Sequence, residues 1–154
     1  VGETKETMLH MIDNAIPHLT EAKPRYLMGV GTPEDILEAV ERGVDMFDCV
    51  HATRISRHGA FWTKQGRRII KNSEFTTDPS PLEKTCKCES CQNYSRSYIR
   101  HLIREKETLG MRLLTIHNLH FLLNFMQEIR ESIKKKEFKK FKTTFLKKFK
   151  SKNG

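Results

Sequence analysis

The stretch RYLMGVGTPEDILEAVERGVDMFDCV, residues 25–50, holds the clearest helix start in the chain between two apolar runs. Its first apolar run ends on glycines, and a second apolar run, VDMFDCV, occupies residues 44–50. Between the two runs, Thr32 can cap a helix, Pro33 suits its first position, and Gly43 suits the position just past its end. A strand, a helix and a second strand joined by short turns form a βαβ unit, so the sequence predicts an α/β fold with a parallel sheet.

Asp48 lies near the C-terminal end of the second predicted strand. Functional side chains gather at this edge of parallel sheets, but an isolated buried carboxylate is costly without a partner. The residues alone therefore leave two interpretations open: an ion pair with Arg54 or Arg57, or a catalytic carboxylate. Both arginines are expected in a polar loop after the strand, where guanidinium groups could recognise phosphate or carboxylate.

Helical spacing of apolar residues recurs on both sides of this unit. It predicts a helix over residues 6–19, ended or kinked by Pro17, and another over residues 91–107, starting at a cysteine cluster. Residues 51–85 look irregular or weakly β, with RRIIKN as a possible strand. A longer helix is expected from about residue 115 to 135, with one apolar side formed by Leu119, Leu122, Leu123, Met126, Ile129 and Ile133.

Three of the four cysteines form the pattern C-x-C-x-x-C at Cys86, Cys88 and Cys91. These soft ligands on one tight loop predict a zinc site rather than a disulfide framework, which fits a reducing cytoplasm. The fourth ligand is expected to be His117, from within a predicted helix; the rivals are His101, His120 and Cys49. Four protein ligands leave no open position, so the zinc is expected to be structural.

The formal charge of +9 is concentrated at the C-terminal end. Residues 134–152 hold ten lysines and one glutamate, and the remainder of the chain balances to zero. Phenylalanines at spacings of three or four residues make this tail an amphipathic helix. A solvated face and a contact with nucleic acid phosphates are both open readings, with a membrane-surface helix as a minor third. No apolar run has membrane-spanning length, and no membrane association is expected.

Several blocks occur in the order and spacing typical of tRNA-guanine transglycosylases: RYLMGVG, DMFDCV followed by TR-x-x-R, C-x-C-x-x-C, SRSYIRHL and HN at 117–118. The chain resembles the C-terminal portion of that family over almost its whole length. The resemblance implies the C-terminal part of a (β/α)₈ barrel with a zinc-binding helical subdomain. The implied domains are the last βα units at residues 1–75, the zinc-binding subdomain and closing helix at 76–133, and the Lys-rich helix at 134–154.

The resemblance also implies a reaction, in which guanine at the wobble position of a GU-containing anticodon is exchanged for 7-aminomethyl-7-deazaguanine on the way to queuosine. Asp48 matches the nucleophile that forms a covalent bond to ribose, and Arg54 and Arg57 match residues that hold anticodon-loop nucleotides. The remaining matches by resemblance are Met28 and Gly29 against the base, Val1, Gly2 and Glu3 at the end of a base-recognition loop, and Cys86, Cys88, Cys91 and His117 as the four zinc ligands.

Some expectations concern what lies outside these residues. The family's second catalytic aspartate belongs to the N-terminal half of the barrel, so the chain alone is expected to be inactive. Relatives form homodimers, and a homodimer is expected of the full-length protein. The alternative hypothesis is a non-catalytic, zinc-containing RNA-binding accessory protein derived from the family. His51-Ala52 and Ile55-Ser56 depart from the residues common in bacterial relatives, which affects the expected tRNA contacts and not the nucleophile.

Overall fold

The computed structural model describes residues 4–149, and the chain divides into two compact units, residues 1–51 and 52–154. Helices predominate, and a barrel is not visible in the described part. The elements of the first unit are α1 (Lys5–Ala15), the 3₁₀ helix η1 (Ile16–His18), β1 (Tyr26–Leu27), α2 (Pro33–Glu41) and β2 (Met46–Phe47). Those of the second are α3 (His51–Arg57), which begins at the boundary, β3 (Ala60–Thr63), β4 (Gly66–Ile69), η2 (Ser73–Phe75), α4 (Glu89–Asn93), α5 (Arg96–Arg104), α6 (Thr108–Lys134) and α7 (Phe138–Phe149).

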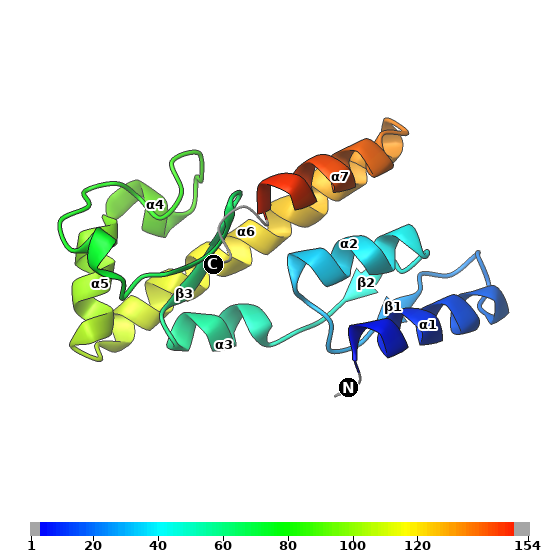
Figure 1. Ribbon diagram of the computed structural model, residues 1–154, viewed down its shortest axis with the longest axis horizontal. Coiled ribbons are helices and arrows are strands. Elements are labelled where there is room, and N and C mark those ends of the chain that lie inside the picture. Colours follow the sequence, from blue (N-terminus) through cyan, green and yellow to red (C-terminus); the bar gives the residue numbers. More distant parts are fainter. Residues whose placement is uncertain (1–3, 150–154) are drawn as a thin grey trace. The chain divides into compact units, whose positions relative to one another are not determined.

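The predicted βαβ unit is present in the first unit (Figure 1). β1 and β2 pair in parallel, although each strand has only two residues. The hydroxyl of Thr32 accepts a hydrogen bond from the backbone N–H of Asp35 at 3.2 Å, and Pro33 is the first residue of α2, as the sequence predicts. Gly43 follows the helix with a φ of +94°, a conformation that glycine adopts without steric cost. A small core of Ile12, Ala39 and Val44 joins α1, α2 and the start of the second strand segment.

The prediction that Arg54 and Arg57 lie in a loop is wrong. Residues 51–57 form α3, because Ala52, Ile55 and Ser56 recur at helical spacing and bury one face of it. Both arginines lie on the opposite, exposed face. A helix holds the two guanidinium groups in a more definite arrangement than a loop would.

The single helix expected over residues 91–107 is in fact two. The backbone is extended at Tyr94, and Ser95 caps α5 by accepting a hydrogen bond from the N–H of Tyr98 at 3.2 Å. The local serine cap therefore competes successfully with helix continuation. RRIIKN contributes only in part to a strand, since β4 covers Gly66–Ile69 and pairs antiparallel with β3.

The long helix α6 is confirmed, but it begins at Thr108, and its buried face is not the one expected. Of the six apolar residues expected along one side, Ile129 is buried, whereas Leu119, Leu123 and Ile133 are exposed. The buried face carries Leu113, Leu114, His117, Asn118, Phe121, Phe125, Ile129 and Ser132. Polar His117 and Asn118 lie at its centre because both find hydrogen-bond partners there, which an apolar pattern cannot reveal.

The amphipathic tail helix is confirmed as α7, which lies along α6 in Figure 1. Phe145 is 4.5 Å from Phe125 of α6 between ring centroids, and Phe149 stacks on Phe145 at 5.0 Å. Residues 150–154, the end of the predicted Lys-rich segment, lie outside the described residues. Within the described residues, no helix is long and apolar enough to cross a membrane.

Candidate functional site

The predicted zinc ligands come together in the second unit. Cys86, Cys88, Cys91 and His117 each offer one donor atom, and the four atoms lie within 4.8 Å of one another. Cys88 caps α4, its Sγ accepting a hydrogen bond from the N–H of Cys91 at 3.4 Å, so the turn that starts the helix also gathers two thiols. His117 approaches from the middle of α6. Residues that lie 26 to 29 positions apart in sequence thus form one cluster.

A backbone carbonyl fixes the orientation of His117. Its Nε2 lies 2.7 Å from the carbonyl oxygen of Trp62, which can only accept, so Nε2 carries the proton. Nδ1 is then directed at the thiols, 3.3 Å from Cys91 Sγ and 3.7 Å from Cys88 Sγ. This arrangement, in which the second ring nitrogen is held by a carbonyl, is the usual one for a metal-binding imidazole.

The donor set fits zinc. A tetrahedral ion with bonds of about 2.3 Å to sulfur and about 2.0 Å to nitrogen separates its S and N donors by about 3.5 Å, and the separations of Nδ1 from Cys91 Sγ and Cys88 Sγ bracket this value. His120 was a rival for the fourth position; its Nδ1 contacts Cys86 Sγ at 3.5 Å, but it lies outside the four-donor cluster. With four protein donors and all of them wholly or partly buried, the zinc would cross-link the fold rather than bind a substrate.

The titratable groups of the cluster shift one another's pKa values strongly. Hydrogen bonds from Cys86 and Cys91 hold the pKa of Cys88 far below the ordinary thiol value. Hydrogen bonds with Cys86 and Cys88 raise the pKa of Cys91 far above that value. Burial lowers the pKa of His117, but hydrogen bonds with Cys86 and Cys88 outweigh burial and raise the pKa to about 9. Zinc would displace these shared protons, so its binding weakens as the pH falls.

Asn118, next to His117, is a buried junction that sequence reasoning missed. Its amide nitrogen donates to the carbonyl oxygen of Ala60 and to Ser56 Oγ at 3.1 and 2.8 Å, and also lies 3.3 Å from the carbonyl oxygen of Ala52. Its carbonyl oxygen accepts from the N–H of Trp62 at 3.0 Å. One side chain thus joins α6 to both α3 and β3. The available signal was the HN pair at residues 117–118, which is part of the family pattern.

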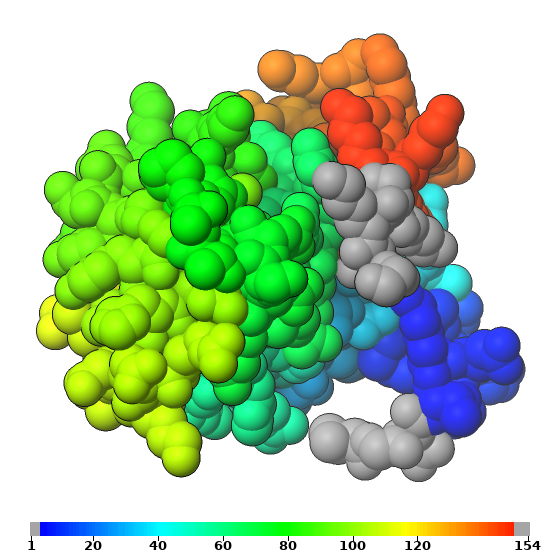
Figure 2. Space-filling model, turned by 60° about the vertical axis from the view of Figure 1, so that its left-hand side comes forward, coloured from blue at the N-terminus to red at the C-terminus, as the bar shows by residue number. Residues whose placement is uncertain are grey.

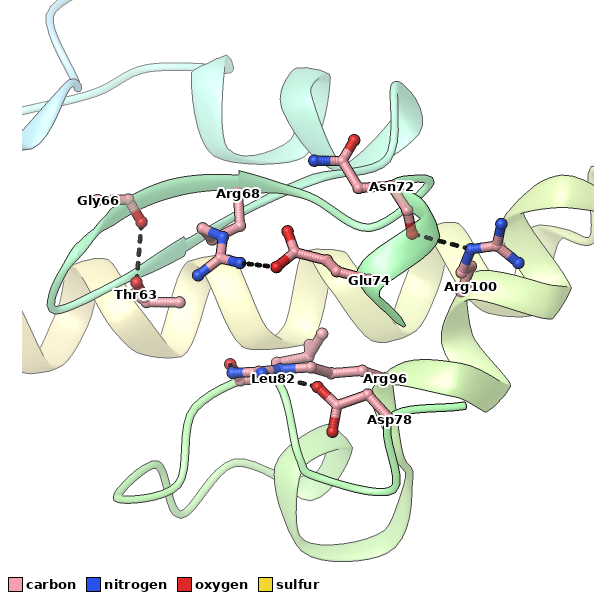
Figure 3. Close-up of polar contacts among 9 residues, drawn as sticks. All are labelled: Thr63, Gly66, Arg68, Asn72, Glu74, Asp78, Leu82, Arg96 and Arg100. Atoms are coloured by element: carbon pink, nitrogen blue, oxygen red, sulfur yellow. Dashed lines mark hydrogen bonds and ion pairs between the residues drawn. The ribbon is translucent and has the colours of Figure 1, made fainter. Parts of the chain in front are cut away.

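Arginines of α5 fasten the long loop that precedes the cysteines (Figure 3). Arg96 binds Asp78 at 2.9 Å and donates to the carbonyl oxygen of Leu82 at 2.9 Å, while Arg100 donates to the carbonyl oxygen of Asn72 at 3.1 Å. Burial raises the pKa of Asp78, but hydrogen bonds from Ser80 and Arg96 outweigh burial and hold the pKa below its usual value. The loop that delivers the thiols is therefore anchored by charge-assisted bonds.

In the first unit, Asp48 lies at the carboxyl edge of the parallel pair. It follows β2 directly, and its Oδ1 accepts hydrogen bonds from the phenol of Tyr26 at 2.6 Å and from the N–H of Gly29 at 3.3 Å. The hydrogen bond from Tyr26 lowers the pKa of Asp48 most, and the bond from Gly29 lowers it further. The bond between Tyr26 and Asp48 also raises the pKa of Tyr26. The carboxylate is exposed rather than buried. It is therefore ionised and accessible to a ligand.

Two further predicted residues lie at this edge. Gly29 follows β1 with a φ of +74°, and Met28 is 67% exposed. A side chain at Gly31 would collide with Cβ of Cys49, so the two chain segments can approach closely only with glycine there. Val1, Gly2 and Glu3 lie outside the described residues. Sequence reasoning missed Tyr26, although it lies two residues before Met28 on β1, the strand that pairs with β2.

Comparison with known proteins agrees with this arrangement. Residues 1–151 match the family model described as TGT, queuine tRNA-ribosyltransferase. The chain is 54% identical over 149 residues to a queuine tRNA-ribosyltransferase of Halothermothrix orenii, covering 97% of this chain and 40% of the relative. It is 51% identical over 152 residues to the one from Fusobacterium nucleatum, covering 99% of this chain and 41% of the relative. The chain thus spans about 40% of the length of these relatives. On this evidence, the chain belongs to the queuine tRNA-ribosyltransferase family.

Proposed function

We propose that this chain forms the C-terminal part of a transglycosylase that exchanges guanine at the wobble position of a GU-containing tRNA anticodon for 7-aminomethyl-7-deazaguanine. The observation that carries the proposal is the environment of Asp48, an exposed, ionised carboxylate at the carboxyl edge of two parallel strands. Family membership supplies the reaction class, and this edge supplies a side chain able to perform it.

Asp48 acts as a nucleophile in this proposal. Both hydrogen bonds found for its side chain in the described residues go to Oδ1, so Oδ2 is the oxygen that attacks C1′ of the ribose. The glycosidic C–N bond breaks, guanine leaves with a proton supplied by an acid, and an ester joins Asp48 to the ribose. The nitrogen of the incoming base then attacks C1′, loses its proton and releases the carboxylate. Two displacements retain the configuration of the sugar.

Other residues position the RNA and the base. The exposed thioether of Met28 offers an apolar surface for a base, and Gly29 lets the base approach its backbone closely. Val1, Gly2 and Glu3 would end the loop that recognises the base. Arg54 and Arg57, exposed on α3, would bind anticodon-loop phosphates, and the target nucleotide must leave its stack to reach Asp48. The zinc, once bound, supplies a structural cross-link and takes no part in these steps.

The remaining parts of the proposal concern the whole protein. The (β/α)₈ barrel, the second catalytic aspartate and the homodimer would all require residues beyond those described. We therefore expect the 154-residue chain alone to show no guanine exchange, because the acid that protonates the leaving base is missing. Robust exchange by the isolated chain would contradict this expectation.

A chimaera tests the function. This chain replaces the matching 149 residues of the Halothermothrix orenii relative, and the product is incubated with tRNA and radiolabelled guanine. We expect exchange, a covalent RNA adduct that survives denaturing electrophoresis, and a loss of about 10⁴-fold or more in rate for Asp48→Asn.

Asp45→Asn is the matched control. Asp45 is three residues from Asp48 and also exposed, but its carboxylate accepts from the N–H of Arg25 at 2.8 Å and is structural. Its variant should retain the adduct. An Asp48→Asn chimaera that exchanges guanine normally would refute the assignment, and tRNA binding without any adduct would favour the non-catalytic RNA-binding alternative.

A further inference from the structure

The lysines of the C-terminal helical hairpin form a face that the proposed function leaves unused. We propose that this face binds the phosphate backbone of the RNA substrate, which extends the proposed function to a second RNA contact. We define the basic face by six exposed side chains at the end of α6, in the α6–α7 turn and on α7: Lys134, Lys135, Lys136, Lys139, Lys140 and Lys147. The turn and α7 lie at the molecular surface in Figure 2, drawn in orange to red.

The lysines lie opposite the apolar side of α7. Phe141, Phe145 and Phe149 recur at spacings of four and pack against one another and against Phe125 of α6. Lys139, Lys140 and Lys147 project from the other side of the helix. The rise along the helix axis from Lys139 to Lys147 is about 12 Å. The direction of the charged side is therefore set by ring packing, and the ammonium groups are presented together to solvent.

Three acidic side chains, Glu128, Glu131 and Glu137, lie beside this face, and Glu128 pairs with Lys64 at 2.9 Å. Lys134 pairs with Glu131 at 2.9 Å and Lys140 with Glu137 at 3.7 Å, but these pairs are solvent-exposed and contribute little. Among the described residues, no ion pair engages Lys136, Lys139 or Lys147. Since the rest of the chain is electrically balanced, nearly all of its surplus positive charge is concentrated at this end. A polyanion is the partner that such a surface attracts.

The packing of α7 favours RNA over a membrane. A helix that binds a membrane surface inserts its apolar side among the lipids. In α7, that side is already covered, because Phe145 and Phe149 are buried against α6 and each other. Only the charged side remains for a partner, and the chain belongs to a tRNA-modifying family. Phosphate contacts of this kind would hold the RNA without reading its sequence.

The test measures binding of the full 154-residue chain to an unmodified tRNA with a GU-containing anticodon across a range of salt concentrations. Replacing Lys139, Lys140 and Lys147 together by Gln should reduce the slope of log K against log salt by about 2 to 3. Lys136→Gly should reduce it by about 1. Lys136 has a φ of +58°, where glycine is favoured, so this variant removes charge without harming the fold.

The matched control replaces the exposed Lys23, Lys71 and Lys84 by Gln, which removes the same charge elsewhere. This control should leave the slope unchanged, and zinc content and thermal unfolding should be unchanged in every variant. An equal loss in the control would overturn the proposal, since net charge would then be the cause. An unchanged slope in the face variants, or no RNA binding by the original chain, would also overturn it. So would binding to phosphatidylserine vesicles that exceeds binding to tRNA.

The outcome is separable from that of the proposed function. The covalent adduct assay depends on Asp48, whereas the salt slope depends on the basic face. Adduct formation with an unchanged slope would refute the basic face alone. A reduced slope without any adduct would refute the transglycosylase assignment and retain the RNA-binding face.

Discussion

The zinc cluster and the Asp48 edge place their reactive side chains in opposite environments. In the cluster, Cys88, Cys91 and His117 are buried and every donor faces another donor. At the edge, Asp48 is exposed, and the two side-chain hydrogen bonds that it accepts within the described residues both go to Oδ1. A site whose donors are all directed inward stabilises a fold, while a site that leaves one reactive atom directed outward can meet a substrate. This contrast separates a structural centre from a candidate catalytic one within the same chain.

Disrupting the zinc cluster should have the largest effect on stability. Cys88→Ser, or chelation of zinc, should release the metal and lower the free energy of unfolding of the second unit by several kcal/mol, because structural zinc binding is coupled to folding. Elemental analysis and thermal unfolding measure the two effects. Cys49→Ser is the control, since Cys49 lies in the first unit and should not affect zinc content. Unchanged zinc in Cys88→Ser would rule out the metal centre.

Asn118→Ala tests whether the stability of the second unit depends on the hydrogen bonds of Asn118 as well as on zinc. The variant leaves the N–H of Trp62 and the acceptors on α3 and β3 without their partner, which should cost about 2 to 4 kcal/mol of unfolding free energy in urea titrations. Asn124→Ala, an exposed position on the same helix, should cost less than about 0.5 kcal/mol. Equal costs at both positions would show that Asn118 is not a junction.

Asp78→Asn tests the anchor of the cysteine loop. Removing a partly buried charged partner of Arg96 should cost about 1 to 2 kcal/mol near neutral pH. The folded pKa of Asp78 is depressed, so its stabilising effect is present above the ordinary carboxyl pKa and is lost as the pH falls through the lower folded value. Unfolding midpoints of the original chain and the variant should therefore converge in acid. A difference that persists there would contradict the ion-pair explanation.

Tyr26→Phe should give the smallest change in stability, together with a specific change in the pKa of Asp48. Loss of the phenol removes the strongest influence that lowers the pKa of Asp48, so that pKa should rise toward its ordinary value. Carboxyl chemical shifts followed by NMR through an acid titration measure it. Tyr94→Phe, on a tyrosine of the other unit, is the control and should leave the Asp48 titration unchanged. A Tyr26→Phe titration identical to the original would show that Tyr26 does not act on Asp48.

The zinc cluster and the Asp48 edge differ in how much of each can be predicted from the sequence. The three cysteine ligands are predictable because C-x-C-x-x-C is a local pattern whose spacing follows from coordination geometry, whereas the choice of His117 rested on the family resemblance. The βαβ unit was predicted because Thr32, Pro33 and Gly43 mark helix ends locally. The location of Arg54 and Arg57 was wrong because α3 is too short for its periodicity to stand out. Tyr26 was missed because its partner is 22 residues away.

Local features of this protein can be read from its sequence: helix caps, the cysteine spacing, the charge of the tail and the motifs of its family. The tertiary structure decided which face of α6 is buried, which nitrogen of His117 faces the thiols, and which oxygen of Asp48 is held. The physical reason is the range of the interactions. Caps and turns join residues a few positions apart, whereas Trp62, Asn118 and Tyr26 act on partners more than 20 positions away, which only folding brings into contact.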